Sequence, residues 1–220
     1  MTDTKTDTHA DTPQPRPRWR KHVIRAAVIA PIVTAIVFYI GVKDRWFKPP
    51  YPETGKAICW LIGGQEEAYN FGKVVPGKVY RSARPDERLY RYVADTYGVR
   101  QVVRLCGPED TDVIPLPPDD LNMDVTIVSW ESSIIPPRDE LRRVLSVLDD
   151  ETPALVHCSA GVHRTGFAVG AYRVLRQGWS AERAREEMQR YSWNDLSEND
   201  LYIHLGKLAR MRDGAAHASR

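Results

Sequence analysis

Short apolar runs alternate along most of this chain with segments in which apolar residues recur at helical spacing. The runs predict four strands, at 79–82, 99–105, 125–130 and 154–157. The helical spacing predicts helices at 85–98, 136–148, 164–177, about 180–191 and about 197–212. Strands that alternate with helices predict an α/β fold, with a central, mostly parallel sheet of four to five strands and helices on both faces.

The apolar stretch nearest the N-terminus has no polar face, unlike the predicted helices. Residues 26–42 carry no charge, and Val23 and Ile24 lengthen the stretch to the lower limit for crossing a bilayer. It therefore predicts one transmembrane anchor at 23–42. A secretory signal peptide is the alternative, but the stretch is long for one and no small-x-small cleavage site precedes Lys43.

The rest of the chain divides around this anchor. Residues 1–22 are rich in Thr, Asp and Pro and predict a disordered tail with a basic end, and 43–58 predict a Pro-rich linker. Residues 59–213 then form the globular domain. More basic residues precede the anchor than follow it, which predicts a single-pass protein with its N-terminus inside and this domain outside the cytoplasm.

Composition excludes several classes of function. The net charge is only +2, so the chain lacks the excess of positive charge that would indicate a nucleic-acid partner. The three cysteines do not form a disulfide framework or a zinc pattern, and no metal or cofactor is predicted, although His157, Cys158 and His163 are close in sequence. Cys59 and Cys106 could pair in an extracytoplasmic domain, but we favour core thiols.

The strongest chemical signal is the segment 154–166, where an apolar strand leads through a tight loop into a helix. Backbone N–H groups at such a junction face an anion. Cys158 follows the strand, and the helix N-terminus and the Arg164 guanidinium favour its thiolate form. The Arg164 fork matches two oxygens of a phosphate, so the sulfur is placed to attack phosphorus and form a cysteinyl-phosphate. Thr165 could donate a hydrogen bond to the sulfur when it leaves.

The segment His157-Cys158-x5-Arg164-Thr165 resembles the signature loop of the cysteine-dependent protein tyrosine phosphatase superfamily, and especially its compact dual-specificity branch. The resemblance covers about residues 70–190, and 77–85 and 98–103 look like the opening strands of small bacterial and plant-type members. It implies a phosphatase that works without a cofactor. The alternative is a buried structural cysteine beside a coincidental arginine.

The resemblance also implies roles for the remaining loop residues. His157 orients the loop and is structural rather than a proton carrier, while His163 touches the phosphate or faces solvent. Arg81 and Arg84 could line the mouth of the site, but a surface role is favoured. The phosphate-binding loop itself comprises Ser159, Ala160, Gly161, Val162 and His163.

The general acid is the weak point of the resemblance. The family places an aspartate, often beside a tryptophan, on a loop after the strand that precedes the cysteine strand. Here that loop, 129–137, has no aspartate at the usual place. Glu131 is the first candidate and Asp139 the second, and Asp110 or Asp112 on the preceding loop are further alternatives. Glu131 could also be only a solvated loop residue.

The expected substrate is a phosphorylated protein or a small phosphate ester. None of the five variable loop positions is Lys or Arg, which favours phosphotyrosine-type or aryl phosphates over strongly anionic substrates. Inositol phosphates and a membrane lipid phosphate stay open as alternatives. A hypothesis from another class is a catalytically impaired phosphate-binding module tethered to a bilayer through residues 23–42. No oligomeric state is predicted.

Overall fold

The computed structural model describes residues 53–61, 63–106, 115–131 and 134–218, together with a few single positions between 33 and 40. The tail expected at 1–22 and most of the anchor expected at 23–42 lie outside the described residues. Within the described ranges, no helix is both long and apolar enough to cross a membrane. The chain forms two compact units, 1–40 and 41–220, and the helices and strands from Glu53 onward belong to the second.

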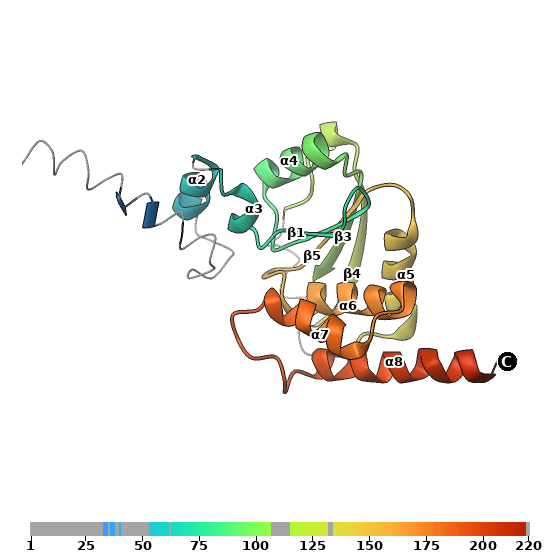
Figure 1. The fold of residues 1–220 in the computed structure, drawn as a ribbon. Helices are drawn as coiled ribbons and strands as arrows, with labels where there is room; N and C mark the ends of the chain where they lie inside the picture. The colour runs from blue at the N-terminus through green and yellow to red at the C-terminus, as the bar shows by residue number, and fades with distance from the viewer. Residues whose placement is uncertain are drawn as a thin grey trace, which may run out of the picture. The chain divides into compact units, whose positions relative to one another are not determined.

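A five-stranded sheet lies at the centre of this second unit, in the order β1-β2-β5-β3-β4 (Figure 1). Only the edge strand β1 runs antiparallel to its neighbour, so the prediction of a mostly parallel sheet is confirmed. Among the strands of the described residues, β1 is the one that the sequence pattern did not predict. The strands are β1 (Gly72–Val75), β2 (Val79–Ser82), β3 (Gln101–Cys106), β4 (Asp124–Ser129) and β5 (Ala154–His157).

Helices cover both faces of the sheet, with α4 on the opposite side from α6 and α8 (Figure 1). The long helices are α4 (Glu87–Tyr97), α5 (Arg138–Asp149), α6 (His163–Gln177), α7 (Ala181–Arg190) and α8 (Asp200–Ala218). The short ones are α2 (Glu53–Leu61), α3 (Gln65–Ala68) and the 3-10 turn η2 (Asp119–Leu121). The five long helices were all predicted, four of them within two residues at each end, whereas α8 begins and ends later than expected.

Helix α4 begins later than predicted. It was expected to open at Pro85, but Asp86 is its N-cap, and the Asp86 carboxylate accepts a hydrogen bond from the Leu89 N–H at 3.1 Å. An aspartate satisfies one of the free N–H groups at a helix start, which proline cannot do. On its core side α4 buries Leu89, Tyr90, Val93 and Ala94.

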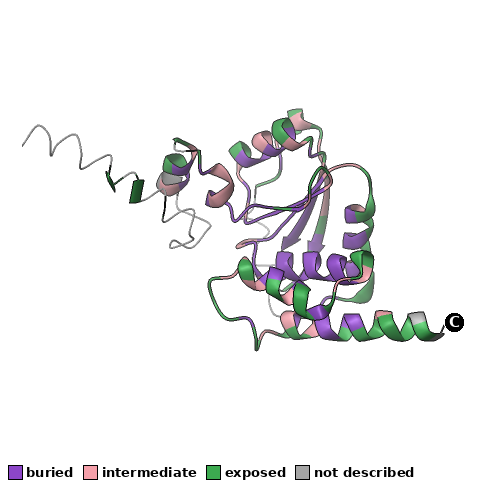
Figure 2. Cartoon of the chain, in the orientation of Figure 1, coloured by how far each residue is buried: buried purple, intermediate pink, exposed green. Residues whose placement is uncertain are grey.

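Helix α6 is the centre of the core (Figure 2). Every residue from Arg164 to Val174 is buried, as expected for a helix that packs on the sheet on one side and on α7 and α8 on the other. Two glycines allow the close packing, because a Cβ at Gly166 would lie 2.7 Å from Met188 and one at Gly170 would lie 2.8 Å from Leu205. The strand and the helix that flank the cysteine loop are therefore both anchored in the core.

A helix occupies part of the segment that was expected to be a linker. The linker expected at 43–58 overlaps α2, which begins at Glu53 and buries Lys56 and Cys59. The prolines before residue 53 suggested an extended spacer, but the following residues have enough apolar surface to pack. At the other end, α8 continues to Ala218 rather than ending near 213.

Candidate active site

Cys158 follows the last residue of β5 directly, and its side chain is buried. The register pairs Ser82 of β2 and Arg104 of β3 with His157, so the cysteine lies just beyond the carboxyl ends of β5 and β2 and next to the last residues of β3. Ligands bind at this edge of open α/β sheets. The Gly161 N–H donates to the Cys158 Sγ at 3.2 Å, and α6 begins two residues later at His163. The loop therefore curls around the sulfur and presents a helix N-terminus to it.

Gly161 has a backbone conformation that the loop cannot form with another residue. Its φ of +70° lies in the left-handed region. A Cβ there would also lie 2.6 to 2.8 Å from backbone atoms of Ser82 and Ala83, which no side-chain rotation could relieve. The loop is therefore packed directly against the segment that follows β2.

Arg81 is a buried residue that supports the cysteine loop. It was expected at the surface, but it is completely buried in β2 and its Nη2 donates to the Gly161 carbonyl at 2.6 Å. The guanidinium also stacks on the Tyr191 ring, 3.6 Å from its centroid. The prediction of a surface position is therefore wrong for Arg81, because this position of β2 faces the cysteine loop rather than solvent. Arg84 is half-buried and contributes its backbone, whose N–H donates to the Ser159 carbonyl at 2.9 Å.

Asn70 is a second supporting residue that the sequence did not indicate. Its Nδ2 donates to the carbonyl of Ala160 at 3.3 Å and to that of Tyr191 at 3.0 Å. Asparagine tolerates the left-handed φ of +50° found here better than most residues. The dipeptide Asn70-Phe71 before a strand was the only signal that could have suggested a turn at this place.

Arg164 lies in the first turn of α6 and is 6% exposed. Its Nη1 donates to the carbonyl of Trp130 at 3.3 Å, which brings the end of β4 next to the cysteine loop. The next residue, Thr165, is completely buried, and its hydroxyl has no hydrogen-bond partner in the described part of the chain. A buried hydroxyl in this position is available to a sulfur or a ligand atom in the loop.

His157 is completely buried, and its Nε2 lies 3.3 Å from the Tyr90 hydroxyl, which donates to the Pro115 carbonyl at 3.1 Å. Burial, reinforced by the nearby charge of Arg104, lowers the pKa of His157 to about 3. The ring is therefore neutral near pH 7 and fixes the strand end rather than supplying a proton.

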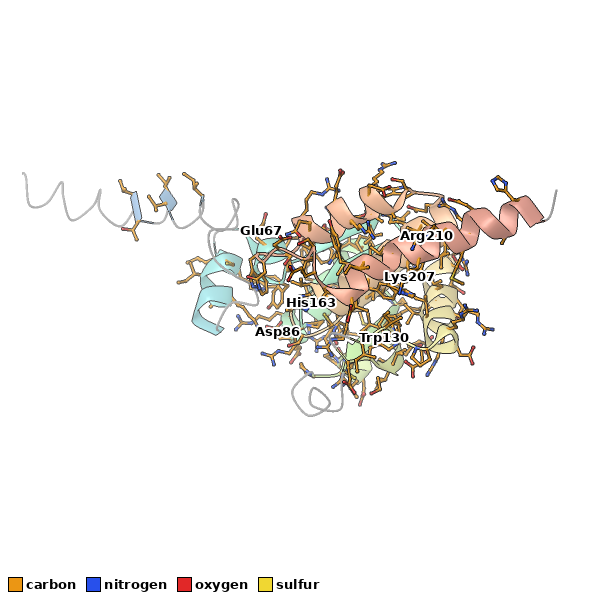
Figure 3. All side chains as sticks on the ribbon, turned by 90° about the horizontal axis from the view of Figure 1, so that it is seen from below. Glu67, Asp86, Trp130, His163, Lys207 and Arg210 are labelled. Atoms are coloured by element: carbon orange, nitrogen blue, oxygen red, sulfur yellow. The ribbon has the colours of Figure 1, made fainter. Side chains whose placement is uncertain are left out.

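His163 is the half-buried first residue of α6. Burial and the charge of Arg164 lower its pKa, so it too favours the neutral form. Figure 3 shows His163 in the region between Asp86 and Trp130. Asp86 is already occupied, because besides capping α4 it accepts a hydrogen bond from Tyr69 at 2.6 Å and lies 3.5 Å from the Lys56 ammonium.

The candidate acids differ in their surroundings. Glu131 is exposed and directly follows Trp130, whose carbonyl Arg164 contacts. Asp139 is exposed in the first turn of α5 and forms an ion pair with Arg142. Asp110 and Asp112 lie outside the described residues.

The cysteines are free and buried, and the structure contains no disulfide between Cys59 and Cys106. Burial raises the pKa of Cys59 to about 11, so this thiol stays protonated. Within the described ranges, no group of three or more His, Cys, Asp or Glu residues could hold a metal ion.

The fold and this loop agree with the sequence match to the tyrosine phosphatase family, which extends over residues 67–205. The chain belongs to this family. It is 42% identical to the dual specificity protein phosphatase TpbA of Pseudomonas aeruginosa over 59 residues, which are 27% of this chain and 26% of that protein. It is 31% identical to the inositol diphosphatase DSP5 of Arabidopsis thaliana over 140 residues, 58% of this chain and 65% of the relative. The chain thus matches less than two thirds of the length of each.

Solved structures of low identity share the fold. The structure of PTPMT1 in complex with PI(5)P superposes with a TM-score of 0.56 at 17% identity, over 66% of this chain and 98% of that one. The catalytic domain of the PP-IP phosphatase SIW14 from S. cerevisiae gives a TM-score of 0.53 at 22% identity, over 69% and 93%. The phosphatase-like fold predicted from the sequence is confirmed.

Proposed function

We propose that this chain is a phosphatase that hydrolyses phosphate monoesters through a cysteinyl-phosphate intermediate, without a metal. The observation that carries the proposal is the position of the Cys158 sulfur. It lies at the carboxyl end of β5, accepts the Gly161 N–H at 3.2 Å and is followed within one loop by the buried Arg164. A thiolate in a cup of N–H groups closed by a guanidinium is a nucleophile for phosphorus.

The residues divide the reaction between them. The loop 159–163 and Arg164 bind the phosphate oxygens, and the Cys158 thiolate attacks phosphorus while the P–O bond to the leaving group breaks. Glu131 gives its proton to the leaving oxygen. Water then attacks phosphorus and gives a proton to the Glu131 carboxylate, the S–P bond breaks with its electron pair going to the Cys158 sulfur, and inorganic phosphate forms. The Thr165 hydroxyl, buried without a partner in the described residues, donates to the departing sulfur.

We assign the acid to Glu131 rather than Asp139. The Glu131 backbone adjoins the Trp130 carbonyl that Arg164 contacts, so a small movement of this loop brings its carboxyl group to a phosphate bound by Arg164. The Asp139 carboxylate is exposed and paired with Arg142. This ion pair holds the Asp139 carboxylate to its own helix.

The preferred substrate is a protein phosphotyrosine or another aryl phosphate, as for a dual-specificity phosphatase. Ser159, Ala160, Gly161, Val162 and His163 add no permanent positive charge to the loop. Inositol phosphates are the second candidate, because the 31% identity to an inositol diphosphatase extends over 140 residues. Rates on a phosphotyrosyl peptide and on a phosphorylated inositol, measured with the same preparation, decide between them.

A bilayer tether completes the proposal. The uncharged run 26–42 and the excess of basic residues before it support a single-pass anchor at 23–42, with the catalytic domain outside the cytoplasm. Alkaline extraction of membranes and protease protection of intact cells test it. Release at high pH would contradict the anchor, and protection of the domain from added protease would contradict the orientation.

Hydrolysis of p-nitrophenyl phosphate by the full chain in EDTA tests the reaction itself. This leaving group needs little protonation, so the assay reports the nucleophile separately from the acid. We expect turnover that Cys158→Ser abolishes, with phosphate binding retained. An unmutated chain that binds phosphate without turnover would be the impaired binding module instead.

A further inference from the structure

A cavity of about 350 Å³ lies between helices α5, α6 and α8, outside the cysteine loop. This volume falls in the range of small-molecule sites, roughly 300–1,000 Å³. Figure 1 shows the three helices on one face of the sheet. The residues that line the cavity are Pro136, Arg138, Leu141, Arg142, Leu145, Phe167, Leu175, Arg176, His204, Leu208 and Met211.

The inner wall of this cavity is apolar. Leu141, Leu145, Phe167 and Leu208 are each at most 7% exposed, whereas Met211 is 47% exposed and lies toward solvent. A wall of buried apolar side chains accommodates an alkyl chain, because burial of each methylene is favourable.

The charged residues of the lining are all of one sign. Three arginines line the cavity and no carboxylate does. Among the described residues, no carboxylate forms an ion pair with Arg138. Arg142 pairs with Asp139 and Arg176 with Asp149, so carboxylates outside the lining balance these two charges. The positive charge of Arg138 is not balanced in this way, and it can attract an anion.

His204 keeps the interior uncharged. Its ring packs against Phe167, with 5.9 Å between the centroids. Burial and the charges of Lys207 and Arg138 lower the pKa of His204, so the neutral ring prevails near pH 7. Lys207 is exposed on α8, one turn of helix after His204 (Figure 3). The positive charges of Arg138 and Lys207 thus lie near His204, while the buried wall of the cavity is neutral and apolar.

We propose that this cavity binds one fatty acid, with its alkyl chain against the leucines and Phe167 and its carboxylate at Arg138. The Arg138 charge selects an anion, and a volume of about 350 Å³ between three helices suits a single alkyl chain. The same walls contact the catalytic machinery. Phe167 packs edge-on against Trp130 at 6.1 Å, and Pro136 ends the loop that contains Glu131. Binding of a fatty acid in this cavity does not depend on the reaction proposed for Cys158.

Photo-crosslinking of the full chain tests this proposal, with dodecanoic acid carrying a diazirine in its alkyl chain as the probe. We expect labelled peptides from α5, α6 or α8, and competition by unlabelled dodecanoate but not by dodecyltrimethylammonium. Arg138→Gln should weaken labelling about tenfold, the loss of one charge-assisted hydrogen bond. Arg143→Gln, on the same helix but outside the lining, is the matched control and should label normally.

A second variant tests the volume instead of the charge. Leu175→Trp narrows the cavity and should reduce labelling, provided that thermal unfolding shows the variant to be folded. Labelling confined to residues 23–42, undiminished by Arg138→Gln, or equally competed by the cationic amphiphile would overturn the proposal. The same labelling by Cys158→Ser shows that the result does not depend on catalysis.

Discussion

The Nη2 of Arg81 lies 2.6 Å from the carbonyl oxygen of Gly161, whose own N–H faces the Cys158 sulfur at 3.2 Å. One residue is therefore held at both of its backbone polar groups. The carbonyl and the N–H belong to the two peptide planes that meet at Gly161, so Arg81 restrains the plane next to the one that faces the sulfur. Arg81 thus positions the loop without touching the substrate.

Replacement of Arg81 tests this relationship. Lysine keeps the charge but neither the fork nor the stacking on Tyr191. A lost charge-assisted hydrogen bond is worth about 1.5–3 kcal/mol, which corresponds to roughly a ten- to hundredfold fall in kcat for Arg81→Lys. Arg88→Lys, on the exposed side of α4, is the control and should be neutral. A kcat for Arg81→Lys equal to that of the control would show that Arg81 does not position the loop.

Gly161→Ala tests the packing of the loop, and Gly178→Ala supplies a matched control. Both glycines have a φ near +70°, at +70° and +67°, but a Cβ at Gly178 would meet nothing within 4 Å. The control should lose about 1–2 kcal/mol of stability, the cost of a left-handed backbone for a residue with a Cβ, and should keep its activity. Gly161→Ala should lose more stability and nearly all turnover. Equal unfolding free energies and equal rates for the two variants would contradict the close approach to Ser82 and Ala83.

The stability of the domain should depend on pH through His157. In the unfolded chain this ring binds a proton below its ordinary pKa of 6.5, whereas burial in the folded protein lowers the pKa to about 3. Because the unfolded state binds more protons, the free energy of unfolding falls as the pH falls from 6.5 toward 3, by at most about 1.4 kcal/mol per pH unit. Urea unfolding at pH 7, 6 and 5 should show a shallower decline for His157→Asn. Parallel curves would mean that His157 is not the titrating group.

The acid assignment predicts a dependence on the leaving group. Glu131→Gln should lower kcat on a phosphotyrosyl peptide by roughly a hundredfold or more, the usual contribution of a general acid, and affect p-nitrophenyl phosphate far less. Asp139→Asn is the matched control and should leave both rates unchanged. If instead Asp139→Asn shows the selective loss, the acid lies at the start of α5.

The sequence predicted the parts of the fold that have strong periodicity. The apolar run 154–157 and the helix after Arg164 are buried on nearly all sides, so their patterns were clear. Strand β1 was missed because four residues beginning with Gly72 and Lys73 show little alternation. Helix α2 was missed because the prolines before it suggested a spacer.

The supporting residues of the site were harder to predict than its chemistry. Cys158 and Arg164 lie at the two ends of one short segment, so their spacing is visible in the sequence. Arg81 and Asn70 reach that loop from about 80 and 90 residues away. Burial of an arginine inside a strand depends on a partner that only the tertiary structure reveals, and composition favours the surface for such a residue.

Trapping of the phosphoenzyme tests the central claim most directly. The full chain is mixed in EDTA with p-nitrophenyl phosphate that carries radioactive phosphorus, quenched within milliseconds and digested. This should yield a radioactive phosphorylated peptide that contains Cys158. Arg164→Lys should yield far less of it, and Cys158→Ser none. Turnover by the unmutated chain with phosphate on another residue, or with no phosphopeptide at any quench time, would contradict the account.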